Sequence, residues 1–423
     1  MYKTKIKILG ILPMLAFLSF QCITAQTLLK PDRVFDGIEM HANWVVIVDG
    51  NTIIYAGPET GSKQQKVGET ILLNGTTLMP GIIEGHSHIL LHPYNETSWN
   101  DQVLKESPVE RAVRATVHVK NSLMAGITTM RDLGAEGAGY TDVYVKKTIE
   151  EGIIPGPRLL VAGPAIVATG AYGPKGFHDG VTVPLGAEPT SGVANVIETA
   201  RRQMGNGADF IKVYADYRWT PGADSQPTFL QEELDAMVAT ATSAGTYVVA
   251  HASTAEGMKR AIKAGVETIE HGDGGTLELF KMMKAKGIGY CPTLAAGDAI
   301  TRYSGWKKGT DAEPERIKSK RASFLLALES GVDMVFGGDV GVFSHGENYR
   351  EMELMVDYGM APMAVLKSAT SGNANMFHLN ELGSLKKGFL ADIITIQGNP
   401  ASDISAMKNV TFVMKNGIIY KKP

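Results

Sequence analysis

The 423-residue sequence predicts an α/β fold, with a central (β/α)8 TIM-like barrel and a small β-sandwich domain formed from both chain termini. Three observations predict this fold. Short apolar runs alternate with longer amphipathic stretches over residues 78–387, β-branched hairpin patterns stand at both chain ends, and ionisable residues directly follow several apolar runs. Glycine, at 47 residues without a repeat period, suits the many tight turns of such a fold.

Residues 1–25 predict a secretion signal. Three lysines precede an apolar run over residues 8–20, and Ala25 offers a small residue for cleavage. The run is shorter than the ~20 apolar residues of a membrane span, so we expect no transmembrane span in the mature chain. A lipid anchor through Cys22 is the alternative, which its bulky and polar neighbours disfavour. We therefore expect an exported protein, periplasmic or secreted, in which Cys291 is left alone and no internal disulfide forms.

Residues 26–77 and 388–423 together predict the small β-domain. Each segment holds β-branched runs separated by a hairpin signal, Asp49-Gly50 in the first and Asn416-Gly417 in the second. Neither segment is long enough to enclose a good core alone. We therefore expect the two chain ends to pair, with the central residues inserted between them.

Residues 78–387 predict the barrel. The expected strands cover residues 77–83, 128–133, 159–162, 210–214, 247–251, 268–271, 288–292 and 334–339. The expected helices between them include residues 109–125, 230–244, 255–264, 277–286 and 316–330. Eight strands, each followed by helical sequence, match a (β/α)8 barrel in number and in length. An open doubly wound sheet is the alternative, and the placement of the ionisable residues favours the barrel.

Six ionisable residues carry the chemistry that the sequence predicts. Two of them alternate along the first barrel strand and therefore share a face, one lies inside a strand, and three end strands. In a barrel these strand ends converge on one mouth, where side chains from different strands can share a metal. These residues are His86, His88, Lys212, His251, His271 and Asp339.

Each residue also has a plain structural interpretation. A lone His251 or His271 is more often a satisfied buried histidine, and Asp339 after two glycines could cap a helix. Lys212, among Ile, Val and Phe, needs a partner, for which Asp216 or Asp132 is the simplest candidate. Five strand positions that suit a shared metal, in the right order along the chain, favour the metal site.

The chain resembles the amidohydrolase superfamily, specifically its imidazolonepropionase-like and prolidase-like (Xaa-Pro dipeptidase-type) members. The resemblance spans nearly the whole mature chain and rests on the segments MPGIIEGHSH, AGITTMRDLG, IKVY, VVAH, IEHG, GGD and KKGFLADI. It implies two divalent metal ions, the first held by His86, His88 and Asp339 and the second by His251 and His271. It also implies a CO2-derived carbamate on Lys212 that bridges the two metals. Zn2+ suits this ligand set best, with Mn2+ or Co2+ as alternatives.

The expected reaction follows from metal chemistry. A hydroxide that bridges two metal ions forms near neutral pH and attacks a polarised carbonyl. Asp339 is expected to act as general base and then as general acid toward the departing nitrogen. We expect the substrate to be a dipeptide or an N-acyl amino acid. A cyclic amide or imide, an ester, mononuclear deamination, and a catalytically silent binding protein on the same scaffold are the alternatives.

Candidate substrate contacts are fewer and weaker. Tyr214 shares a strand face with Lys212, and Tyr172 stands where prolidase-like relatives often carry a histidine in a Gly-Gly-His-Gly element. His178 and His345 lie in loops, and Arg218 and Arg131 could pair with a substrate carboxylate. The segment over residues 134–139, GAEGAG, lacks the dinucleotide spacing GxGxxG and is set aside.

Charge excludes one class of partner. The formal net charge of −3 gives a polyanion no attraction, so we expect a small-molecule substrate and no nucleic acid. A homo-oligomer is left open.

Overall fold

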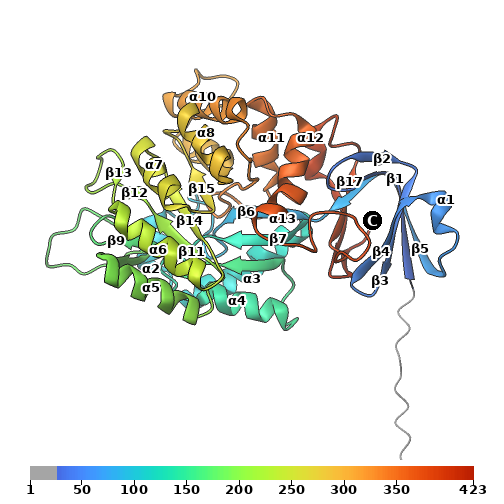
Figure 1. Ribbon diagram of the computed structural model, residues 1–423, viewed down its shortest axis with the longest axis horizontal. Coiled ribbons are helices and arrows are strands. Elements are labelled where there is room, and N and C mark those ends of the chain that lie inside the picture. Colours follow the sequence, from blue (N-terminus) through green and yellow to red (C-terminus); the bar gives the residue numbers. More distant parts are fainter. Residues whose placement is uncertain (1–25) are drawn as a thin grey trace, which may run out of the picture.

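The computed structural model describes residues 26–423, so the predicted signal at residues 1–25 and Cys22 lie outside the described residues. Figure 1 shows two parts side by side, a β-sheet that contains both chain ends and a larger α/β part. Within the described range, no helix is long and apolar enough to cross a membrane.

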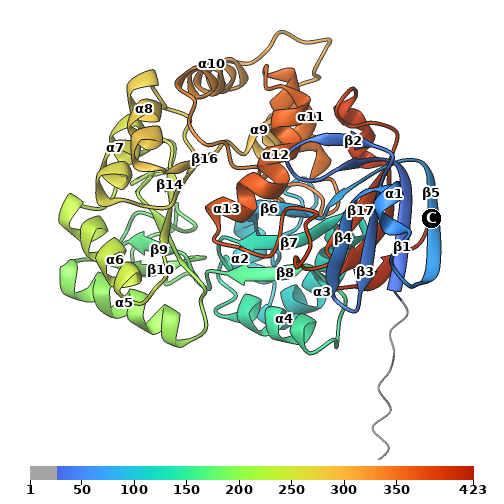
Figure 2. The ribbon, with the colours of Figure 1, turned by 45° about the vertical axis from the view of Figure 1, so that its right-hand side comes forward.

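The smaller part is built on one mixed sheet of eight strands. Its order is β19-β18-β17-β5-β1-β3-β4, with β2 paired to β1, and β1 and β5 run parallel. Figure 2 shows the N-terminal strands beside β17. The strands are β1 (Gln26–Phe35), β2 (Met40–Ala42), β3 (Trp44–Asp49), β4 (Thr52–Pro58), β5 (Val67–Pro80), β17 (Ile393–Gln397), β18 (Val410–Lys415) and β19 (Ile418–Lys421).

This sheet curls around a core of its own. Val46 of β3, Ile53 of β4 and Phe412 of β18 are buried in a single apolar cluster, so strands from the two chain ends share one interior. The two hairpin turns also meet, because a Cβ on Gly417 would lie 1.9 Å from the carbonyl oxygen of Gly50. Only glycine at position 417 allows this approach.

The larger part holds a circuit of parallel strands. β6 (Ile82–Ser87), β7 (Ile127–Asp132) and β8 (Arg158–Val161) pair in order. β11 (Ile211–Tyr214), β14 (Val248–Ala252), β15 (Thr268–His271) and β16 (Gly289–Cys291) pair likewise. The N–H of Asp209 donates to the carbonyl of Val161 at 2.8 Å and links β8 to β11.

Residues 334–340 close the circuit. Met334 bridges Tyr290 of β16, and Val340 bridges Ser87 of β6. Eight parallel segments are thus linked in sequence order, which is consistent with the predicted (β/α)8 barrel. The short strands β9 (Ile166–Ala168) and β10 (Glu188–Thr190) extend the sheet beside β11, and β12 (Asp216–Tyr217) pairs with β13 (Gln226–Pro227).

Helices follow most strands of the circuit. The predicted helices at residues 255–264 and 277–286 match α7 and α8, each capped by a threonine hydroxyl at its start and ended by a left-handed glycine. The helices are α1 (Glu59–Ser62), α2 (Trp99–Lys105), α3 (Pro108–Met124), α4 (Thr141–Glu150), α5 (Val193–Gly205), α6 (Gln231–Ser243), α7 (Ala255–Ala264), α8 (Leu277–Lys286), α9 (Leu294–Tyr303), α10 (Glu315–Ser330), α11 (Tyr349–Asp357), α12 (Pro362–Lys367) and α13 (Asn373–Met376).

Two predicted strands need correction. The strand expected at 77–83 is divided, because β5 runs to Pro80 in the terminal sheet and β6 begins at Ile82. The strand expected at 334–339 is bridged only at its two ends. Two glycines and the left-handed backbone of Asp339, with φ of 61°, interrupt its regular pairing.

Candidate metal centre

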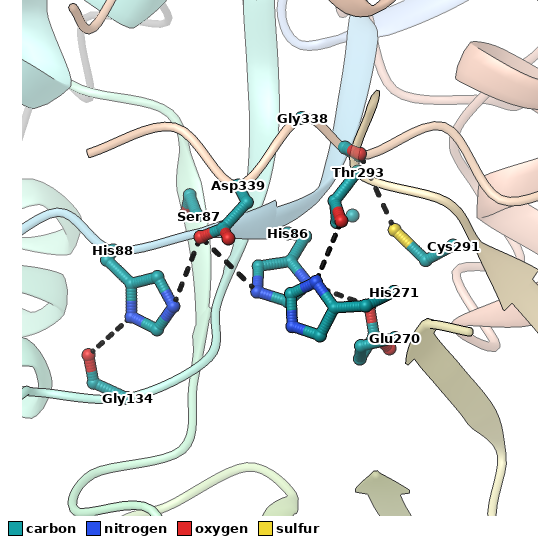
Figure 3. Close-up of polar contacts among 12 residues, drawn as sticks. His86, Ser87, His88, Gly134, Glu270, His271, Cys291, Thr293, Gly338 and Asp339 are labelled. Carbon is teal, nitrogen blue, oxygen red and sulfur yellow. Dashed lines mark hydrogen bonds and ion pairs between the residues drawn. The ribbon is translucent and has the colours of Figure 1, made fainter. Parts of the chain in front are cut away.

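His86, His88 and Asp339 meet at the carboxyl end of β6. The Oδ1 atom of Asp339 lies 3.6 Å from Nε2 of His86 and 3.5 Å from Nε2 of His88, as Figure 3 shows. This oxygen is buried and accepts no hydrogen bond from any described residue. A buried carboxylate oxygen without a donor is costly unless a cation binds it. The three side chains therefore form a candidate divalent-metal site.

Both imidazoles are oriented by partners on their other ring nitrogen. Nδ1 of His86 lies 2.8 Å from Oε2 of Glu270, and Nδ1 of His88 lies 3.0 Å from the carbonyl oxygen of Gly134. Acceptors at both Nδ1 atoms favour the tautomer that places a lone pair on Nε2. Glu270 in turn accepts a 2.9 Å bond from the fully buried Arg131.

Two more histidines lie beside this triad. The His271 ring centroid is 5.1 Å from that of His86 and 4.5 Å from that of His251. Nδ1 of His271 lies 2.8 Å from the hydroxyl of Thr293, which itself donates to a backbone carbonyl. His271 therefore also keeps Nε2 for a ligand. For His251 the contact with Ser253, at 3.3 Å, is on Nε2, so Nδ1 is the ring nitrogen without a hydrogen bond within residues 26–423.

Burial keeps these rings neutral. It lowers the pKa of His251 to about 3, and it holds the pKa of His86 and of His271 well below the usual value, with help from the Lys212 charge. The pKa of Asp339 moves the other way, to about 6, again chiefly through burial. Neutral imidazole is the metal-binding form of histidine, so the ring electrostatics suit a metal centre.

Lys212 lies in β11 among these residues. It is 1% exposed, its Nζ forms no hydrogen bond or ion pair within residues 26–423, and the centroid of the Tyr214 ring lies 5.4 Å from Nζ. Its simplest structural partners are engaged elsewhere. Asp216 accepts bonds from Ser253 and Thr254, and Asp132 accepts from Ile89. Burial lowers the pKa of Lys212, which favours the neutral amine.

A cavity of about 540 Å³ opens over the candidate centre. Its wall includes His88, His251, His271 and Asp339, so these ligand candidates face a space large enough for a small molecule. Aromatic side chains line it densely. Tyr172 and Tyr214 lie with ring centroids 4.7 Å apart and share the wall with Trp99, Tyr94 and Tyr217.

The structure divides the predicted substrate contacts. Tyr172, Tyr214 and Arg218 line the cavity. His178 lies in an exposed loop away from this cavity. His345 is buried, stacks on His118 at 4.4 Å and is bonded to the carbonyl of Leu91, so it packs the fold instead of facing the cavity. Arg131 has the structural role that was the alternative to a substrate contact, because it is fully buried and pairs with Glu270.

Two carboxylates at this site were not predicted. Glu270 precedes the expected ligand His271, and strand alternation points it to the opposite side from its neighbour, where it supports His86. Glu136 lies in the GAEGAG segment that was set aside for lacking a dinucleotide motif. Its place just after the second barrel strand was the available signal, because acidic residues there face the barrel mouth.

Fold and site together define an α/β protein with a candidate divalent-metal site where the parallel strands end. The model of the amidohydrolase family matches residues 77–419, and the chain belongs to this family. Ochratoxinase of Aspergillus niger is 29% identical over 417 residues, which cover 90% of this chain and 83% of the relative.

Solved structures agree with this family. The crystal structure of a Xaa-Pro dipeptidase with methionine bound in its active site shares 32% identity, with a TM-score of 0.81 over 94% of this chain and 100% of that one. A prolidase complexed with N-methylphosphonate-L-proline shares 26% identity, with a TM-score of 0.79 over 94% and 100%. The protein is thus a hydrolase that acts on carbon–nitrogen bonds.

Proposed function

We propose that the protein is a binuclear metal-dependent amidohydrolase that cleaves the amide bond of a dipeptide or an N-acyl amino acid. One observation carries the proposal. The buried Oδ1 of Asp339 has no hydrogen-bond partner among the described residues and lies about equally far from Nε2 of His86 and of His88. That arrangement suits a cation held between an anionic oxygen and two neutral imidazoles.

The residues divide into two ligand sets around Lys212. His86, His88 and Asp339 would hold one metal, and His251 and His271 the other. When bound, divalent ions, with Zn2+ the best match, lower the pKa of water and polarise a carbonyl. The histidine and carboxylate donors match that class of ion.

Lys212 would join the two sets as a carbamate. Its neutral Nζ would add to the carbon of CO2 and release one proton to water, which would convert the amine into a carbamate anion. The absence of any ion pair at Lys212 among the described residues supports this change, since the anion would face cations on both sides. Low basicity of a buried amine leaves it free to react with CO2.

Asp339 would move the proton of the reaction. Its carboxylate lines the cavity beside His86 and His88, where it can accept the proton of the attacking water and pass it to the departing nitrogen. Tyr214, which lines the cavity two residues after Lys212, would donate its hydroxyl to the substrate carbonyl or carboxylate.

Two arginines support a substrate that carries a carboxylate. Arg218 and Arg316 both line the cavity, and neither forms an ion pair within residues 26–423. A carboxylate is the group that a guanidinium binds best. The neighbours named above hold methionine and N-methylphosphonate-L-proline, and both of these ligands carry a carboxylate, which agrees with the choice.

A hydrolysis panel tests the proposal. Zn2+-loaded protein is assayed against dipeptides and N-acyl amino acids, beside Asp339→Asn and the matched surface variant Asp333→Asn, whose carboxylate pairs with Lys284 in the open. We expect turnover by the wild type, loss of kcat by about 10²- to 10⁴-fold in Asp339→Asn, and little change in Asp333→Asn. Turnover of esters or cyclic amides alone, or full activity in Asp339→Asn, would overturn it.

We also propose that the chain is exported by way of residues 1–25. N-terminal sequencing of protein expressed from the full gene should begin at Gln26. Recovery of the chain with Met1 in place would contradict this.

A further inference from the structure

Glu136 is a buried anion in the cavity wall that the proposed reaction does not use. It is 2% exposed and lies in the loop that follows β7. Its Oε1 atom is 3.7 Å from Nδ1 of His88, the ring whose Nε2 faces Asp339. One imidazole therefore separates this carboxylate from the candidate metal centre.

The two carboxylate oxygens of Glu136 accept different numbers of hydrogen bonds. Oε2 accepts a 2.8 Å bond from the Trp99 indole and a 3.0 Å bond from the Tyr172 hydroxyl. Oε1 has only the Tyr214 hydroxyl, at the 3.5 Å limit of a hydrogen bond. Nδ1 of His88 is committed to the carbonyl of Gly134. Oε1 thus keeps capacity for a further donor.

No lysine or arginine side chain pairs with the Glu136 carboxylate among the described residues, and its one ion-pair contact is with the His88 ring at 3.7 Å. The guanidinium of Arg111 donates instead to the backbone carbonyls of Leu90, Ala135 and Glu136 itself. The other cavity anion, Asp273, differs in this respect because Lys320 pairs with it at 2.7 Å. A buried carboxylate without a paired cation is unfavourable until a positively charged group binds it.

The backbone holds Glu136 in a costly conformation. Its φ is 47°, in the left-handed region that side chains other than glycine, asparagine and aspartate rarely adopt. The Arg111 guanidinium donates to the carbonyl oxygens of Ala135 and Glu136 and so holds this loop in place. Strain of this kind, held by its surroundings at a cavity, is typical of a residue with a functional task.

We propose that Glu136 binds the α-ammonium group of the substrate, which makes the enzyme selective for dipeptides with a free amino terminus over N-acyl amino acids. The inference rests on the proposed function and narrows its substrate class. In a dipeptide the amino group is one carbon away from the scissile carbonyl. That short separation corresponds to the place of Glu136 beside His88, with Arg218 and Arg316 left for the carboxylate end.

Matched substrate pairs test this role. Each pair differs only by the amino group: Ala-Pro with propionyl-proline, and Phe-Leu with 3-phenylpropionyl-leucine. We expect the metal-loaded wild type to favour the amine member in kcat/KM, and Glu136→Gln to lose about 10- to 100-fold on that member alone, the range for one charge-assisted hydrogen bond. The preference should also decline above pH ~8, where the α-ammonium loses its proton.

Two further variants separate this role from a structural one. Asp273→Asn removes a paired anion of the same cavity and should change both members of a pair equally. If Glu136→Gln fails to fold, Glu136→Asp takes its place in the test. This variant keeps the negative charge and should retain part of the preference for the amine member.

The outcomes separate the two proposals. Equal losses on both members in Glu136→Gln, or equal rates on both members in the wild type, would overturn the role of Glu136 and leave amide hydrolysis intact. If the wild type hydrolyses none of the four compounds, the proposed function is refuted as well.

Discussion

Replacement of Glu270 by glutamine should weaken both the metal centre and the fold. Glu270 is fully buried, and its two oxygens serve different partners. Oε2 contacts Nδ1 of His86 at 2.8 Å, while Oε1 accepts from Arg131 at 2.9 Å and from the hydroxyl of Thr268. Glutamine keeps the shape but offers one acceptor oxygen, so either the imidazole or the guanidinium must face an amide NH2.

The expected magnitudes follow from these contacts. Arg131 is also fully buried, and removal of one partner of a buried ion pair costs roughly 3–5 kcal/mol because the other charge is left uncompensated. Its packing against the Phe377 ring, at 4.1 Å, offsets only part of this loss. Loss of the carboxylate behind His86 should reduce metal affinity by about 10- to 100-fold.

Two assays check this prediction. Urea unfolding of the metal-free protein measures the free energy of unfolding, and competition with a chelator measures metal affinity. Glu256→Gln is the matched control, because Glu256 is half-exposed and pairs with Arg260, so its loss should cost below about 1 kcal/mol. A Glu270→Gln protein as stable and as metal-avid as the control would refute the reasoning.

Four further predictions concern the metal centre and its surroundings. Burial raises the pKa of Asp339 to about 6, so a proton competes with the metal and affinity, measured by chelator competition, should fall as the pH drops through about 6. In the metal-free protein the free energy of unfolding should depend on pH in the opposite sense. Because the folded protein raises the pKa of Asp339, the stability that this group contributes is present at low pH and is lost as the pH rises through about 6. Gly337→Ala would place a Cβ 2.6 Å from Sγ of Cys291 and 2.8 Å from the backbone nitrogen of His86, so elemental analysis should show loss of metal. The control is Gly205→Ala, whose Cβ meets nothing within 4 Å and which should bind metal normally. His178→Ala should leave kcat/KM within about twofold, because the exposed side chain is outside the cavity, and a larger loss would contradict that placement.

The metal-ligand candidates at the strand ends could be predicted from the sequence, because the pattern of apolar runs followed by histidines is local. His86 and His88 alternate on one strand, and His271 directly ends an apolar run. The parallel pairing that brings such ends together follows from the strand–helix alternation. The division of residues 77–83 between two sheets could not be predicted from the sequence. Pro80 and Ile82 belong to equally apolar runs, and only their pairing partners distinguish them.

The supporting residues could not be predicted for a different reason. Glu270 and Glu136 derive their roles from contacts with residues far away in the sequence, such as His86 and Trp99. The position of Glu136 just after a barrel strand places it near the mouth, but the partners that define both roles cannot be inferred from neighbouring residues. Conversely, a loop histidine such as His178 has the right chemistry for a substrate contact, yet it is exposed and does not line the cavity.

The metal content of the wild type and of Lys212→Ala tests the central claim most directly. Elemental analysis of chelator-free protein should give about two divalent ions per chain in the wild type, and one or none in Lys212→Ala, since an alanine at position 212 cannot form the carbamate. One ion per chain in the wild type, or two in Lys212→Ala, would contradict a binuclear centre bridged by Lys212.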